Sequence, residues 1–196
     1  MRICGLDECG RGAWAGPLVA AAVVLNCSRQ RLVRIAGTKL RDSKLLNAKQ
    51  RQKIYQALKK TEAEMAVEVI SDRQINNRGI GWANREIFRR LIKRIEADEY
   101  IADGTIKIGK VKGRPAIKSV IDADEKIPPA IAAGIVAKEE RDKLMRRMHK
   151  EFPKYGWKTN TGHGTRAHFL AIEAWGMTKY HRTVFVTTAL KNSNGL

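Results

Sequence analysis

Acidic side chains stand at the ends of predicted strands in an otherwise basic sequence. Asp7 and Glu8 follow the first apolar run, Asp103 closes a later one, and Asp122 and Asp124 follow another. Like charges held close together repel, so such a cluster is unfavourable unless a cation lies between the carboxylates. Ligand sets made of oxygen alone favour Mg²⁺ or Mn²⁺. The pattern therefore predicts a divalent-metal site.

Each acidic position also has an ordinary structural explanation. Asp103 before Gly104 is a common turn signal. The consecutive pair Asp7 and Glu8 is harder to explain in this way, because two adjacent acids between apolar strands turn at least one carboxylate toward buried surface. Asp122 and Asp124 lie two residues apart and would share one face of a strand, so spacing alone does not choose between them.

Charge and composition narrow the class of partner. The chain has 196 residues, of which 43% are hydrophobic, enough for one domain with a buried core. Its 38 Lys and Arg against 20 Asp and Glu give a net charge of +18, which predicts a polyanionic partner, nucleic acid before membrane. For a nuclease, a pair of carboxylate-bound ions about 3.5–4 Å apart is the usual apparatus for cutting phosphodiesters.

The ends and the cysteines point to a cytoplasmic protein. Only Met1 and Arg2 precede the first apolar residues of the first predicted strand, which leaves no room for a signal peptide, and no apolar run reaches the roughly 18 residues that span a bilayer. Cys4, Cys9 and Cys27 are odd in number and lack the paired spacing of a zinc site. We expect them to be reduced.

The glycine pattern beside the first acids has a competing interpretation. The motif Gly10-x-Gly12-x-x-Ala15 fits a relaxed dinucleotide fingerprint, which requires a helix to begin inside it. Here a Gly-Pro pair and the β-prone residues 18–25 follow instead. We therefore expect a loop whose backbone groups grip a sugar-phosphate strand.

The order of predicted elements gives the fold class. Strands are predicted at 2–6, 18–25, 64–69, 100–103 and 117–121. Helices are predicted from the N-cap Asn47 to Lys60, around 82–95, from Pro128 onward and over 166–175. We predict loops at 26–46, 76–79 and 106–114. The result is an α/β fold with a central sheet, in one domain over 1–196, with 152–196 as a C-terminal substrate-contacting extension.

Several blocks occur in the order found in one family, and together they cover nearly the whole chain. The sequence resembles a type 2 ribonuclease H, ribonuclease HII. The blocks are Gly5-Leu6-Asp7-Glu8-Cys9-Gly10-Arg11-Gly12 with Ala15-Gly16-Pro17, Asp42-Ser43-Lys44, Asp103-Gly104, Ala123-Asp124-x-Lys126-x-Pro128, Ala132-Ala133-x-Ile135-Val136-Ala137-Lys138 with Arg141-Asp142, and His181-Arg182 with Phe185.

This resemblance implies a ribonuclease H-like fold, with a mixed five-stranded sheet, flanking helices and a helical C-terminal portion. It implies hydrolysis of RNA in RNA–DNA hybrids, and incision 5′ of single ribonucleotides in duplex DNA, leaving a 3′-hydroxyl and a 5′-phosphate. The implied cofactors are two Mg²⁺ or Mn²⁺ ions held by Asp7, Glu8, Asp103 and Asp124, the family's Ala-Asp-x-Lys block selecting Asp124 over Asp122. We expect a monomer.

The resemblance also assigns substrate contacts. Gly10, Arg11 and Gly12 match the loop that recognises the ribose 2′-hydroxyl. The expected phosphate contacts are Ser43, Lys44, Lys138 and Arg141. His163 stands where the family commonly has a tyrosine that packs on the deoxyribose after the ribonucleotide, and Gly134 replaces a usual serine. Two rival functions are a non-catalytic nucleic-acid binder of this fold and a nuclease of the fold that acts on DNA alone.

Overall fold

The structure, a computed structural model, describes residues 1–105 and 108–193. These residues divide into two compact units. The first unit holds Met1–Cys9, Val19–Val69 and Arg85–Glu139, and the second holds Gly10–Leu18, Ile70–Asn84 and the chain from Glu140 onward. Part of the predicted basic segment 106–114, residues 106–107, lies outside the described residues.

A mixed five-stranded sheet forms the centre of the first unit, in the order β3-β2-β1-β4-β5. Strand β1 is antiparallel to β2 and parallel to β4, which is parallel to β5. The bounds are Ile3–Cys9 for β1, Leu18–Val24 for β2, Glu64–Ile70 for β3, Glu99–Asp103 for β4 and Ile117–Val120 for β5. The mixed sheet is confirmed, with the first two strands inside it and β3 at an edge.

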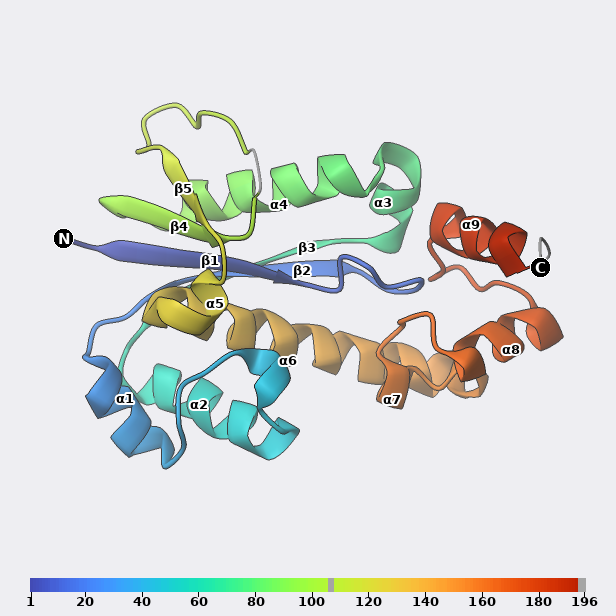
Figure 1. The fold of residues 1–196 in the computed structure, drawn as a ribbon, viewed down its shortest axis with the longest axis horizontal. Helices are drawn as coiled ribbons and strands as arrows, with labels where there is room; N and C mark the ends of the chain where they lie inside the picture. Colours follow the sequence, from blue (N-terminus) through green and yellow to red (C-terminus); the bar gives the residue numbers. More distant parts are fainter. Residues whose placement is uncertain (106–107, 194–196) are drawn as a thin grey trace. The chain divides into compact units, whose positions relative to one another are not determined.

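Helices cover both faces of this sheet (Figure 1). One face carries α4, and the other carries α1, α2, α5 and the first part of α6. A buried cluster of β2, α1, α2 and α6 side chains fills the second face, including Val23, Leu32, Leu58 and Ile135. The bounds are Arg29–Ala36 for α1, Ala48–Lys60 for α2, Ile80–Arg94 for α4, Ala123–Lys126 for α5 and Pro128–Glu151 for α6.

The start of α2 follows the sequence prediction, but the residues before it do not. The Gln50 N–H donates to the Asn47 side chain, and the Asn47 N–H donates to the Gln50 side chain, so the predicted N-cap Asn47 forms part of a capping box. The loop expected over 26–46 is wrong in part, because Arg29–Ala36 is helical. Ser28 caps that helix and Gly37, with φ +61°, ends it. Helix α1 buries only two of its eight residues, Leu32 and Ala36.

The second unit is mainly helical. Helix α8 spans the predicted residues, whereas the turn expected at 76–79 is wrong in part, because α3 runs through Arg78 with Ser71 and Gln74 as its capping box. An apolar cluster around Trp157, Tyr155 and Met145 forms the core. The bounds are Asp72–Arg78 for α3, Trp157–Asn160 for α7, Arg166–Trp175 for α8 and Thr183–Ser193 for α9, with 3₁₀ turns at Ser43–Leu45 in the first unit and Pro153–Tyr155 in the second.

Two expectations from composition can be compared with the described residues. The three cysteines are free thiols. Within the part of the chain that the structure describes, no helix is both long and apolar enough to cross a membrane.

Strand β1 and helix α6 approach each other closely at Gly5. A Cβ atom on Gly5 would lie 2.1 Å from the Pro129 carbonyl carbon and 2.2 Å from the Ala130 nitrogen. Both are backbone atoms and cannot rotate away. The absence of a side chain at this position therefore fixes how near the helix lies to the strand that carries Asp7 and Glu8.

We expect Gly5→Ala to destabilise the protein by about 3 kcal/mol or more, the upper end of the usual cost of overpacking a core. Gly12→Ala is the matched control, since no atom lies within 4 Å of the Cβ it would add. The midpoint of urea unfolding measures the effect. Equal midpoints for the two variants would contradict the proposed role of Gly5.

Candidate active site

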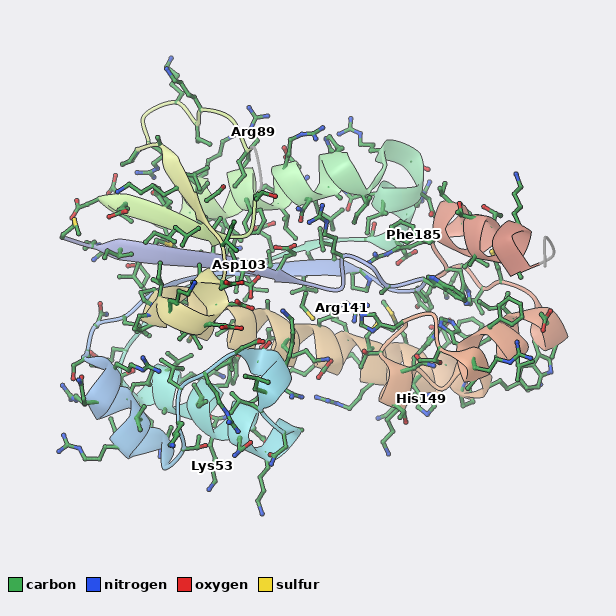
Figure 2. All side chains as sticks on the ribbon, in the orientation of Figure 1. Lys53, Arg89, Asp103, Arg141, His149 and Phe185 are labelled. Carbon is green, nitrogen blue, oxygen red and sulfur yellow. The ribbon has the colours of Figure 1, made fainter. Side chains whose placement is uncertain are left out.

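Neighbouring parallel strands bring the first three acidic residues together in the first unit. Asp7 and Glu8 lie in β1, and Asp103 is the last residue of β4. The register pairs Leu6 of β1 with Ala102 of β4, so Asp7 and Asp103 come next to each other one residue further along. Figure 2 shows Asp103 beside the start of α5.

The structure separates Asp122 from Asp124. Residues 123–126 form the short helix α5 rather than the end of a strand, so the two acids do not share a strand face. The Asp103 carboxylate accepts hydrogen bonds from the N–H groups of Ala123 at 2.8 Å and Asp124 at 3.4 Å. Asp124 is buried, at 8% exposed, whereas Asp122 is exposed and adopts a left-handed backbone with φ +58°.

Burial and mutual repulsion disfavour the charged form of these carboxyls. Burial raises the pKa of Asp7 well above its ordinary value, and the charges of Glu8, Asp103 and Asp124 raise it further. The Glu8 N–H, which donates to Asp7 Oδ1 at 2.7 Å, opposes this rise in pKa. Burial and Asp103 likewise raise the pKa of Asp124, against the effect of Lys44. The four acids thus form one electrostatic cluster.

A glycine of α6 makes room for one of these carboxylates. A Cβ on Gly134 would lie 2.3 Å from Asp7 Oδ2, so this carboxylate oxygen occupies the space that a larger residue would fill. Glycine inside a helix costs about 1 kcal/mol relative to alanine. The helix therefore accepts a local loss of stability where it passes the acidic cluster.

A lysine places a positive charge beside the cluster. Lys44 Nζ lies 3.3 Å from Asp124 Oδ2 and 4.0 Å from Asp42 Oδ2. Burial opposes the charge of Lys44, but Asp42 and Asp124 outweigh it and raise the lysine's pKa. Asp42 is 7% exposed and is the first residue of the Asp-Ser-Lys block, but the sequence analysis did not place it among the acids beside Lys44. Ser43 lies between them and is half-buried, as is Lys138 of α6.

The donor chemistry of the cluster suits a hard divalent cation, since its ligand atoms are carboxylate oxygens. A cation would also relieve the repulsion that raises the pKa of Asp7. Within the described residues, no three His, Cys, Asp or Glu side chains are spaced as a ready-made metal site. The cluster supplies the ligand types for Mg²⁺ or Mn²⁺.

In the second unit, buried arginines hold the glycine loop. Arg141, which the family resemblance assigns to substrate phosphate, is 0% exposed. Its guanidinium donates to the carbonyls of Thr161 at 2.8 Å, Pro17 at 3.0 Å and Ala15 at 3.2 Å. Gly10 has φ +91°, and a Cβ there would lie 1.9 Å from Arg141 Nε. Only glycine fits at this position of the loop.

Arg182, the residue directly before α9, holds the same loop. It is fully buried, and it donates to the carbonyls of Gly16 and Arg11, both at 2.9 Å. Burial and the charge of Arg141 lower the pKa of Arg182 to about 9, against the effect of Asp72. The Arg11 side chain and Gly12 are exposed, so the tip of a firmly held loop faces solvent.

His163 is exposed on a loop that a buried histidine positions. The His163 carbonyl accepts from His168 Nδ1 at 2.8 Å, which places the His168 proton on Nδ1. His168 Nε2 then accepts from Trp157 Nε1 at 3.1 Å and from His181 Nε2 at 3.1 Å. Burial lowers the pKa of both buried histidines, that of His181 to about 4. Sequence reasoning missed this network, because nothing in the sequence marks His168 as buried.

Comparisons with known proteins support the resemblance. The family model described as Ribonuclease HII matches residues 4–188. A ribonuclease HII from Pelagibacter ubique is 38% identical over 185 residues, which cover 93% of this chain and 95% of that protein.

Solved structures share the fold. A chain of the PCNA:RNase HII complex from Archaeoglobus fulgidus has a TM-score of 0.79 at 24% identity, covering 93% of this chain and 94% of that one. Bst-RNase HIII in complex with Mn²⁺ has a TM-score of 0.69 at 22% identity, covering 100% of this chain and 71% of that one. At these identities the likeness concerns the fold alone.

We expect Asp7→Asn to raise the thermal unfolding midpoint at pH 8 in EDTA. A carboxyl with a raised pKa holds its proton more tightly in the folded state, so the wild type loses stability as pH rises from about 3.8 through the raised value. The gain should therefore shrink toward zero as pH falls to about 3.8. Asp122→Asn, at an exposed position, should leave the midpoint unchanged. A gain independent of pH would refute this explanation.

Proposed function

The chain belongs to the ribonuclease HII family and has its ribonuclease H-like fold, and we propose that it incises single embedded ribonucleotides in duplex DNA besides hydrolysing RNA in RNA–DNA hybrids. Cleavage on the 5′ side of the ribonucleotide would leave a 3′-hydroxyl and a 5′-phosphate. The observation that carries the proposal is the cluster of Asp7, Glu8, Asp103 and Asp124 in the first unit, whose mutual repulsion a divalent cation would relieve.

These four carboxylates would hold two Mg²⁺ or Mn²⁺ ions. When bound, the ions supply an activated water and stabilise the charge on the departing 3′-oxygen. The use of Mn²⁺ is consistent with the solved Mn²⁺ complex of Bst-RNase HIII, a distant relative by fold. In this chain Asp103 also orients α5, and with it Asp124, through two hydrogen bonds from the helix backbone.

Recognition of the ribose is assigned to the loop tip of Gly10, Arg11 and Gly12. A 2′-hydroxyl both donates and accepts hydrogen bonds, and backbone groups of an exposed loop can match it. Four hydrogen bonds from Arg141 and Arg182 to carbonyls of residues 11–17 support this assignment, because they fix the loop before substrate arrives.

The remaining contacts divide by exposure. Ser43, Lys44 and Lys138 are assigned to substrate phosphates. The guanidinium of Arg141 donates its hydrogen bonds to backbone carbonyls, so we assign this residue to positioning the glycine loop instead of binding phosphate. The exposed ring of His163 would pack on the deoxyribose that follows the ribonucleotide, in place of the tyrosine common in the family.

We expect Asp124→Asn to lower cleavage by at least about 10²- to 10³-fold, the scale of losing one transition-state electrostatic contact. Asp122→Asn is the matched control two residues away, and it should cleave normally. One gel compares a full hybrid, a duplex with a single ribonucleotide, and plain DNA, with Mg²⁺ and with Mn²⁺. A reversal of the two variants would overturn the choice of Asp124, and cleavage of plain DNA would favour a DNA nuclease.

We expect His163→Tyr to increase incision at a single ribonucleotide about fivefold, which corresponds to about 1 kcal/mol of added stacking. Hydrolysis of a long hybrid should change little, because it contains no RNA–DNA junction near most cleaved bonds. The ratio of the two kcat/KM values measures the effect. His163→Ala should lower the ratio, and a ratio that is the same in all three proteins would remove His163 from the recognition site.

A further inference from the structure

The positive charge of the chain is concentrated in one short segment. Residues 28–61 contain eleven Lys and Arg but only one acid, Asp42, so they carry +10 of the net +18. The segment comprises α1, the 3₁₀ turn Ser43–Leu45 and α2, which we call the α1–α2 hairpin. Among these eleven cations, the site described above assigns a role in substrate binding to Lys44 alone.

Three lysines of the hairpin share one face of α2. Lys49, Lys53 and Lys60, together with Gln52 and Gln56, line a hollow of about 430 Å³. Their spacing of three, four or seven residues places them on one side of the helix. Ile35 and Ala36 of α1 line the other side, and no acidic residue lines the hollow. All three lysines are exposed, and no described residue forms an ion pair with their ammonium groups.

The hairpin is fixed to the elements that carry the acidic cluster. Lys44 Nζ contacts Asp124 Oδ2 at 3.3 Å, where the hairpin passes α5. Arg51 Nε donates to Glu139 Oε1 of α6 at 3.1 Å, and both side chains are nearly buried. The hairpin's apolar side chains belong to the same buried cluster as those of α6. The three exposed lysines therefore lie on a rigid extension of the site.

We propose that this lysine face binds the phosphate backbone of the duplex beyond the cleaved bond. Lys49 to Lys60 spans about 16 Å of helix, the length of about five base pairs. The lysines and amides supply hydrogen-bond donors to phosphate, with no acid to repel it. The lining lacks the aromatic residues with which amphipathic helices enter a bilayer, which favours nucleic acid over a membrane. The inference rests on the proposed function.

The test compares two triple variants that remove equal charge from opposite faces of the sheet. One is Lys49→Ala, Lys53→Ala and Lys60→Ala; the control is Arg85→Ala, Arg89→Ala and Lys93→Ala on α4. Figure 2 labels Lys53 and Arg89 on their two helices. Alanine is the best helix former, and thermal unfolding checks both folds. If the first triple fails to fold, glutamine replaces alanine at the same positions.

Binding of a 20-base-pair hybrid in EDTA is measured against salt concentration. Each lost phosphate contact lowers the slope of log K against log salt by about 0.9, so the hairpin triple should lower it by nearly 3 and the α4 triple by much less. The hairpin triple should also lose most of the wild type's preference for a 20-base-pair over a 6-base-pair hybrid. Equal slope changes in both triples, or an unchanged slope in the hairpin triple, would overturn the proposal.

Two further measurements test whether the lysine face binds membranes instead of nucleic acid, and whether the protein cleaves the hybrid. If the hairpin triple loses binding to phosphatidylserine vesicles but keeps its affinity for the hybrid, the surface binds membranes and the proposal is wrong. Cleavage of the hybrid by the unaltered protein is measured separately with Mg²⁺. Because the binding assay needs no cleavage, failure of the nuclease assignment and failure of the hairpin surface give different results.

Discussion

Repulsion between carboxylates is the constraint on which the rest of the first unit depends. Asp7 lies near Glu8, Asp103 and Asp124, and burial together with these charges raises its pKa. A folded chain tolerates such a group only if other contacts hold the carboxylates in place. The close approach of β1 and α6 at Gly5, the space left at Gly134, and the hydrogen bonds from α5 to Asp103 provide that framework. Local stability is thus exchanged for a concentrated negative charge that can attract metal ions.

The parts of the fold that could be predicted from sequence are those marked by a continuous apolar run or by a capping motif. The seven residues of β2 are all buried, and α2 begins at a capping box that two residue types announce. Helices α1 and α3 were missed because they are short, with eight and seven residues, and bury only two residues each. The capping box of Ser71 and Gln74 was readable and marks α3, whereas the apolar pattern does not.

The positions of site residues could be predicted only where these residues lie in strands or directly follow them. Apolar runs placed Asp7 and Asp103 in or directly after neighbouring strands, but strand spacing could not choose between Asp122 and Asp124, because the left-handed residue Asp122 turns the chain into α5. The Ala-Asp-x-Lys block supplied the choice that spacing could not. The burial of Arg141 could not be predicted from the sequence at all. Its burial depends on carbonyls from residues more than a hundred positions away in sequence, and no local pattern reports such a partner.

The distribution of charge follows from the demands of acting on a polyanion. An acidic cluster repels phosphate until cations neutralise it, so the carboxylates cannot supply affinity for the substrate by themselves. Cations placed among them would compete with metal ions, and Lys44 lies at the edge of the cluster with a largely exposed side chain. Affinity is therefore best placed nearby but outside, on a rigid element joined to the same helix. The α1–α2 hairpin, which carries +10 of the chain's +18 and is anchored through Arg51 to Glu139, meets both requirements.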